Sequence, residues 1–199
     1  MIELPETPAP VSFTARLIDF GTTLVPPLGG AEQRINRSGS KMELSVVMPP
    51  MRNKDEGRIF VSKLIQAQSL GLRMKYPLAG LGSNQDPGSP VVRLDGQIGT
   101  ILRVGGLTPG FSTVEGQPFS VTAADGTSYL HYITRAVNAT ASGNNNFDVW
   151  PPLRDIFNIG DVCEFTNPVI EGLIEGDARE WNISVEHLVG IEFTIRERK

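Results

Sequence analysis

The chain has 199 residues, of which 40% are hydrophobic and 20% charged, and its formal net charge is −4. This balance is ordinary for a globular protein and offers no overall electrostatic basis for specific binding to duplex nucleic acid. The single cysteine, Cys163, excludes an intramolecular disulfide framework and a zinc site built from several thiolates. The first ten residues lack the basic and apolar runs of a secretory signal, and no stretch is apolar enough to span a membrane. We therefore expect a protein that folds in a reducing cytoplasm.

The first forty residues predict one strand between two segments rich in proline or glycine. Three prolines favour an extended arm over residues 1–10, and residues 13–20 predict the strand. Residues 22–40 predict a long loop with apolar side chains at Leu24, Val25 and Leu28. A loop of this length in a compact domain either serves an interaction or covers the edge of its own core. Leu24, Val25 and Leu28 are our candidate subunit-interface residues.

The next segment predicts a strand, a helix and a second strand. Residues 41–48 alternate between apolar and polar side chains, which is typical of a strand with one buried face. Asn53 and Glu56 have the spacing of a capping box, and apolar residues then follow helical spacing, so we predict a helix over about residues 54–70. Gly71 suits the left-handed residue that ends a helix, and residues 72–76 predict the following strand.

Residues 79–90 are rich in Gly, Ser, Asn, Asp and Pro, which predicts a linker. The sequence beyond it contains short β-like runs separated by turn residues, with a hairpin turn at Asp125-Gly126. These runs are residues 100–104, 119–122, 129–134, 147–150 and 162–165. Such spacing is typical of a small barrel or sandwich.

The last twenty-five residues predict a hairpin. Residues 181–185 and 191–195 both alternate with period two, and residues 187–190 have the length of a connection in which Gly190 takes a positive φ. A hairpin needs further strands or a helix against its apolar face, and the one predicted helix lies more than one hundred residues upstream. We therefore predict a split, β-sandwich-like domain of residues 1–89 plus 169–199, interrupted by a small inserted β-barrel of residues 90–168. The fold class is mainly β with one helix.

We assign no catalytic, cofactor-binding or metal-ligating residue and do not expect an enzyme. His131 and His187 lie in separate predicted strands, where a lone histidine is usually packed or hydrogen-bonded. Cys163 has the surroundings of a small core residue, and Gly105-Gly106 lacks the Gly-Lys-Ser/Thr of a phosphate loop. Four acidic side chains could form paired carboxylates, but their spacing favours solvated strand and turn positions. They are Glu164, Glu171, Glu175 and Asp177.

Aromatic residues in the predicted barrel allow two interpretations. On the surface of a small barrel they could stack on sugars or bases, and inside it they would form the core. Few basic residues lie among them, which favours the core. They are Phe119, Tyr129, Tyr132, Phe147 and Trp150.

The order of parts resembles the distal tail proteins of long-tailed, siphovirus-like bacteriophages. These parts are a strand (KMELSVVM), a helix (DEGRIFVSKLIQAQSLG), a strand (LRMKYP), a β insert, and the return NPVIEGLIEGDAREWNISVEHLVGIEFTIRERK. The resemblance covers roughly residues 40–199 and is to the form with an inserted oligonucleotide/oligosaccharide-binding-type (OB-like) barrel. It implies a structural protein of the virion tail, assembled in the host cytoplasm, without cofactors. It further implies a homo-oligomeric, six-membered ring that joins the tail tube protein to the baseplate hub or tail tip protein. The alternative is a carbohydrate-binding module that acts through the barrel at the host surface.

Overall fold

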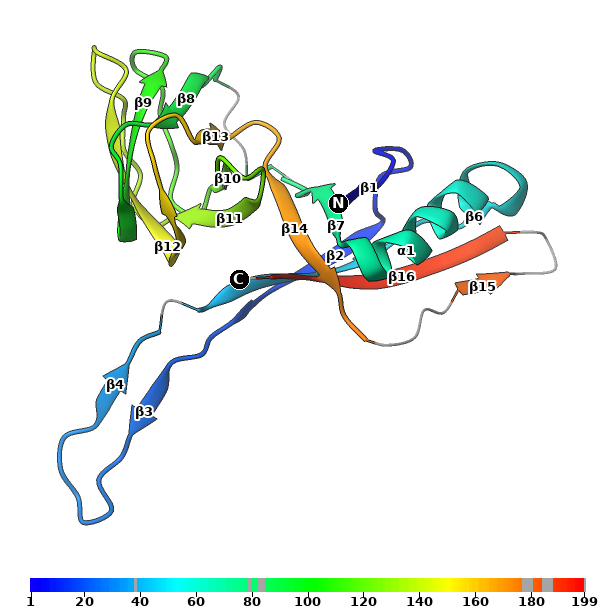
Figure 1. Ribbon diagram of the computed structural model, residues 1–199, viewed down its shortest axis with the longest axis horizontal. Helices are drawn as coiled ribbons and strands as arrows, with labels where there is room; N and C mark the ends of the chain where they lie inside the picture. The colour runs from blue at the N-terminus through cyan, green and yellow to red at the C-terminus, as the bar shows by residue number, and fades with distance from the viewer. Residues whose placement is uncertain (38, 79, 82–84, 177–180, 184–187, 199) are drawn as a thin grey trace.

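The computed structural model describes residues 1–37, 39–78, 80–81, 85–176, 181–183 and 188–198 (Figure 1). Within these ranges the chain forms an eight-stranded sheet, a closed six-stranded barrel, a two-stranded ribbon and one α-helix. The prediction of a mainly β protein with one helix and a small barrel is therefore confirmed.

The main sheet takes its strands from both ends of the chain. Its central path, in spatial order, is β1 (Ile2–Glu3), β7 (Leu72–Lys75), β14 (Val169–Ile174), β16 (Leu188–Glu197), β5 (Lys41–Val47) and β2 (Ser12–Ile18). Two short strands, β6 (Met51–Arg52) and β15 (Trp181–Ile183), pair with the first half of β16. Neighbouring strands are antiparallel except for β1 and β7, which are parallel.

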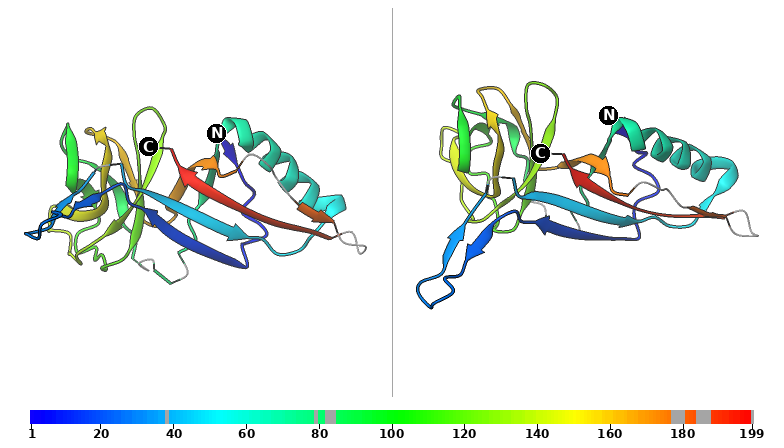
Figure 2. Two further views of the ribbon diagram at one scale, coloured as in Figure 1. Left: turned by 90° about the horizontal axis from the view of Figure 1, so that it is seen from below. Right: turned by 60° about the horizontal axis from the view of Figure 1, so that its bottom comes forward.

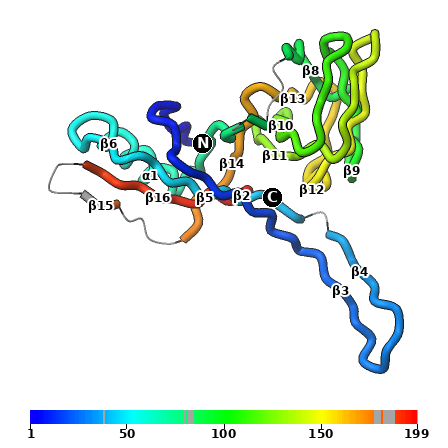
Figure 3. The backbone as a smooth tube through the Cα atoms, turned by 180° about the vertical axis from the view of Figure 1, so that it is seen from behind, coloured from blue at the N-terminus to red at the C-terminus, as the bar shows by residue number. Residues whose placement is uncertain are grey.

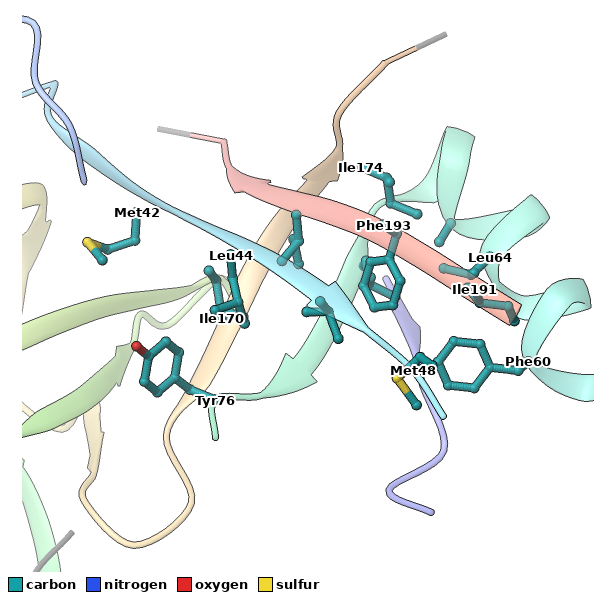
Figure 4. Close-up of a cluster of buried hydrophobic side chains, with 14 of the residues drawn as sticks. Met42, Leu44, Met48, Phe60, Leu64, Tyr76, Ile170, Ile174, Ile191 and Phe193 are labelled. Carbon is teal, nitrogen blue, oxygen red and sulfur yellow. The ribbon is translucent and has the colours of Figure 1, made fainter. Parts of the chain in front are cut away.

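The helix α1 (Arg58–Leu70) covers one face of this sheet, because the alternating strands turn their apolar side chains toward it. Figure 4 shows Phe60 and Leu64 of α1 facing Ile191 and Phe193 of β16. The rings of Phe60 and Phe193 lie 6.2 Å apart, and all four side chains are buried. This packing supplies the partner that the C-terminal hairpin needs.

The start of the helix differs from the prediction. Residues Asn53–Gly57 form a π-helical turn, no side chain caps the helix, and the capping box of Asn53 and Glu56 is absent. Gly57 is buried where a Cβ atom would lie 3.2 Å from Val189, so this position packs closely against β16. At the other end, Gly71 has the expected positive φ of 80°, but its ψ of 163° differs from the predicted left-handed α conformation, and its N–H donates to the Ala67 carbonyl.

The barrel closes in the order β10 (Pro118–Thr122), β11 (Ser128–Ile133), β12 (Asn145–Phe157), β9 (Gln97–Leu107), β8 (Gly88–Val92) and β13 (Val162–Glu164). Its interior is aromatic: the rings of Phe119 and Phe165 stack at 5.0 Å, and Phe147 contacts both. The turn at Asp125-Gly126 joins β10 to β11 as predicted, with Gly126 at φ 84°. The strand β8 begins inside the expected linker, so that linker is shorter than predicted.

The C-terminal hairpin also begins differently from the prediction. Residues 188–190 belong to β16 rather than to a connection, and Gly190 pairs with Asn182 and lacks a positive φ. The expected alternation at residues 184–187, including His187, lies outside the described residues. The strand β16 is therefore ten residues long and pairs along its length with several neighbours.

Candidate functional site

Residues 19–37 and 39–40 form an arm that projects from the end of the main sheet opposite α1 (Figures 1 and 3). The arm contains β3 (Thr22–Leu24) and β4 (Gln33–Ile35), which pair antiparallel, so the prediction of a long loop without strands was wrong. The sequence signal was weak because each strand has only three residues and both carry polar side chains.

Asp19 fixes the base of the arm. Its carboxylate accepts hydrogen bonds from the Gly21 N–H at 2.8 Å and the Ser40 hydroxyl at 2.9 Å, and it forms an ion pair with Arg34. These contacts lower the pKa of Asp19, with the Gly21 N–H as the largest cause. One carboxylate therefore joins both legs of the arm where they leave the sheet.

The tip of the arm holds the three candidate interface residues away from the core. Leu24, Val25 and Leu28 are 50%, 64% and 98% exposed. The turn between the strands is closed by the Gly29 N–H, which donates to the Pro26 carbonyl at 3.3 Å. The alternative that these side chains cover the edge of their own core is therefore wrong. The tip is an exposed apolar group on a projecting ribbon.

The strand β2, which leads into the arm, forms one edge of the sheet. It pairs with β5 on one side and, within the described residues, with no strand on the other. Val11, Leu17 and Phe20 along this edge are 68%, 39% and 47% exposed. An edge of seven residues with unpaired N–H and C=O groups can accept a further strand.

The face of the sheet near this edge carries a row of alternating charges across four strands. Arg16 of β2 contacts Glu43 of β5 at 2.5 Å, and Arg196 of β16 contacts the other oxygen of Glu43 at 2.8 Å. Arg196 also forms an ion pair with Glu175, which follows β14. Ion pairing with both carboxylates raises the pKa of Arg196, chiefly through Glu43. This polar row fixes the register of four strands drawn from distant parts of the chain.

An apolar groove of about 360 Å³ lies between the N-terminal segment and the sheet, and its lining extends from β7 to Met48 and Pro10 beside the start of β2. Residues 3–10 cross over it after β1, and Met48, Phe60 and Met74 lie in its wall. Three contacts hold the crossing segment in place: the Ile2 N–H with the Gly71 carbonyl, Lys63 with the Glu3 carbonyl at 2.6 Å, and Lys75 with Glu6 at 2.8 Å. The predicted extended N-terminal arm is therefore a short strand followed by a fixed, proline-rich wall.

A buried ion pair joins the barrel to the sheet. Arg154 of β12 donates to both carboxylate oxygens of Glu197, at 2.5 and 2.7 Å, and both side chains are 1% exposed. The same carboxylate accepts the N–H groups of Met42 at 2.7 Å and Leu130 at 2.8 Å. Glu197 therefore links β5 and β16 of the sheet to β11 and β12 of the barrel.

A pair of tyrosines reinforces this joint. The hydroxyls of Tyr76 and Tyr132 lie 2.6 Å apart, and their rings meet edge to face. Burial raises the pKa of Tyr132, and the hydrogen bond with Tyr76 adds to the effect. Because the joint is polar, buried and bonded on both sides, the barrel is held in one orientation on the sheet.

The aromatic residues considered for stacking belong mainly to the barrel core. Phe119, Tyr129 and Phe147 are buried, and Tyr132 packs at the joint with the sheet. Trp150 is 37% exposed. The core interpretation therefore holds for most of this set.

His131 and Cys163 are also core residues. The His131 Nδ1 lies 2.9 Å from the Pro151 carbonyl, and burial, aided by Arg154, lowers the pKa of the ring to about 3. The imidazole is therefore neutral and donates from Nδ1. Cys163 is 2% exposed, and burial raises the pKa of its thiol.

The three described members of the acidic set, Glu164, Glu171 and Glu175, do not converge on one pocket. Glu164 accepts the N–H groups of Thr166 and Asn167 in a turn, and Glu175 pairs with Arg196. The expectation of solvated positions was wrong for Glu171, which is 4% exposed because it forms an ion pair with Arg73 beneath the barrel. Asp177 lies outside the described residues.

Gly106, considered above for a phosphate loop, is a barrel residue at φ 76°, where a Cβ atom would meet the Ser89 carbonyl oxygen at 2.3 Å.

Across the described ranges, no three His, Cys, Asp or Glu side chains gather closely enough to hold a metal ion. The described helical segments also include none with the length and hydropathy needed to cross a membrane. Comparison of the chain with protein-family models and with curated protein sequences finds no match. The surfaces best suited to binding another molecule are the arm, the β2 edge and the groove.

Proposed function

We propose that this protein is a structural component of a long-tailed bacteriophage tail. In this proposal it is a distal tail protein whose copies form a ring between the tail tube protein and the baseplate hub or tail tip protein. The observation that carries the proposal is the projecting arm, whose apolar tip at Leu24, Val25 and Leu28 is 50% to 98% exposed in the part of the chain that the structure describes. The order of sheet, helix and inserted barrel supports it through the resemblance to that family.

The two edges of the sheet favour a head-to-tail contact. One edge is β2, which continues into the arm, and the other is β1 with its proline-rich continuation. Because the edges differ, a contact between one and the other is heterologous, and repetition of a heterologous contact closes a ring when the rotation permits. Six subunits are the number that the family resemblance implies.

The tip alone is too small to hold two copies together. Burial of a large apolar side chain contributes about 1.5–3 kcal/mol, so the three partly covered tip residues would contribute on the order of 5 kcal/mol. Association costs at least about 4 kcal/mol in lost translational and rotational freedom. A stable ring therefore also requires further contact along the β2 edge, and each copy in a closed ring takes part in two such subunit contacts.

Light scattering of the purified chain tests the proposal. The wild-type protein should have a mass about six times its 21.6 kDa. A variant with Leu24, Val25 and Leu28 changed to serine should be monomeric with an unchanged circular dichroism spectrum. The matched control changes three equally exposed apolar residues of the barrel, Ile98, Ile156 and Ile159, to serine and should keep the oligomeric mass. A monomeric wild-type protein, or tip variants that remain oligomeric, would contradict the proposal.

Carbohydrate binding by the barrel receives less support. Sugar-binding surfaces need exposed aromatic faces, whereas most aromatic side chains of this barrel pack inward. The ring role is also preferred to an enzymatic one, because the described titratable side chains are used in ion pairs, turns and the core rather than gathered in a cleft.

A further inference from the structure

The arm and the groove lie at opposite ends of β2. The arm follows Ile18, where β2 ends, whereas the groove is lined by residues 8–10, which lead into the start of β2, and reaches from there to β7. Figure 2 shows the arm extending away from the region where the N-terminal segment crosses the sheet. A chain therefore cannot place its own tip in its own groove, but a neighbouring copy can.

The groove suits side chains rather than a strand. Pro5, Pro8 and Pro10 in its wall have no N–H, so this rim cannot extend the sheet by regular pairing. Its floor and walls are mainly apolar, with Met48 and Phe60 among the lining residues. Its volume of about 360 Å³ is at the small end for binding pockets and fits a few apolar side chains.

Both surfaces are fixed before they meet. The arm is held at its base by Asp19 and along its length by pairing of Thr22 with Ile35. The groove is held by the contacts of its crossing segment with α1 and β7. Association of two preformed surfaces avoids much of the ordering cost that flexible segments incur.

We infer that the tip of one copy, around Val25 and Leu28, seats in the groove of the next copy around the ring. This inference rests on the proposed ring and specifies its contact. The arm and the groove are both apolar and lie at opposite ends of β2. Their contact makes the assembly head-to-tail and directional, since each copy gives one tip and receives one.

Disulfide cross-linking between two full-length variants tests this contact. One variant carries Leu28→Cys in the tip, and the other carries Ala9→Cys in the wall of the groove. Cys163 is buried and should not react in the folded protein. The control partner carries Ile159→Cys, which is 61% exposed on the barrel. Under copper-catalysed oxidation, the tip variant should form at least ten times more heterodimer with the groove variant than with the barrel variant.

A second substitution tests the groove without a cross-link. Ala9→Trp should fill the groove and weaken self-association by at least tenfold, whereas Ala141→Trp at an exposed position on the barrel should leave it unchanged. If the chain self-associates but neither effect is seen, the tip-in-groove contact is wrong and the ring remains. Preferential cross-linking to the barrel would also overturn the inference. If the wild-type chain does not self-associate, both the tip-in-groove contact and the proposed ring are wrong.

Discussion

Replacing Arg154 by methionine should destabilise the protein strongly, because the substitution leaves the carboxylate of Glu197 buried without its cation. Both side chains are 1% exposed, and the guanidinium makes two hydrogen bonds to the carboxylate. Removal of one partner from a buried ion pair costs about 3–5 kcal/mol. Glu197→Gln should cost a similar amount, since it leaves the guanidinium buried and unpaired.

The double variant Arg154→Met, Glu197→Gln should be more stable than either single variant. It contains no buried charge, and the glutamine carbonyl can still accept one of the N–H groups of Met42 and Leu130. The remaining unpaired N–H costs about 1–3 kcal/mol. The two single losses in unfolding free energy would sum to about 6–10 kcal/mol. A double-mutant cycle of these variants should therefore show a coupling energy of at least about 3 kcal/mol between Arg154 and Glu197.

Urea unfolding monitored by circular dichroism measures these differences. The unfolding free energy falls by about 2 kcal/mol per molar urea. Each single variant should therefore lower the midpoint of urea unfolding by roughly 1.5–2.5 M, and the double variant should lower it by about 1 M. Lys75→Met is the control, because its ion pair with Glu6 is largely exposed and should contribute at most about 1 kcal/mol. Additive losses in the double variant would refute the assignment of this pair as the joint between barrel and sheet.

Three further predictions concern the buried residue His131, the closely packed Gly172 and the buried Cys163. The folded pKa of His131, about 3, lies below its ordinary 6.5, so stability is fully present above pH 6.5 and falls as the pH drops toward 3. Against a His131→Phe variant, this loss should approach about 1.4 kcal/mol per pH unit in urea titrations, and parallel pH profiles would contradict it. Gly172→Ala should abolish soluble folded protein, because a Cβ atom would lie 1.9 Å from the Arg196 carbonyl oxygen, whereas Gly190→Ala, whose Cβ would meet no atom of the described residues within 4 Å, should express normally. Cys163 should react with a thiol reagent only on unfolding, and rapid labelling of the native protein would show that its burial is wrong.

Local patterns in the sequence predict the elements whose cause is local. The alternation of residues 41–48 gives β5, and the helical spacing after Gly57 gives α1. Asp125-Gly126 gives its hairpin because the turn chemistry lies within two residues. These features depend on neighbours in the chain, which a single sequence displays.

Features set by distant partners could not be predicted in the same way. The sequence predicts that Glu171 is a solvated carboxylate, whereas the fold places Arg73 beside it. Arg154 and Glu197 are 43 residues apart, on opposite sides of the joint, and no local pattern marks them as a pair. The capping box of Asn53 and Glu56 is absent because residues 53–57 form a π-helical turn, which the local sequence pattern did not predict. Residues 22–40 were predicted as a loop with apolar side chains, and the two strands within this segment are too short to give a periodic signal.

Electron microscopy of the purified full-length protein tests the central claim most directly. The account predicts closed rings with six-fold symmetry, in which the arm of each subunit reaches the next subunit. Particles that are uniformly monomeric, or that are two-fold dimers with identical surfaces in contact, would contradict it.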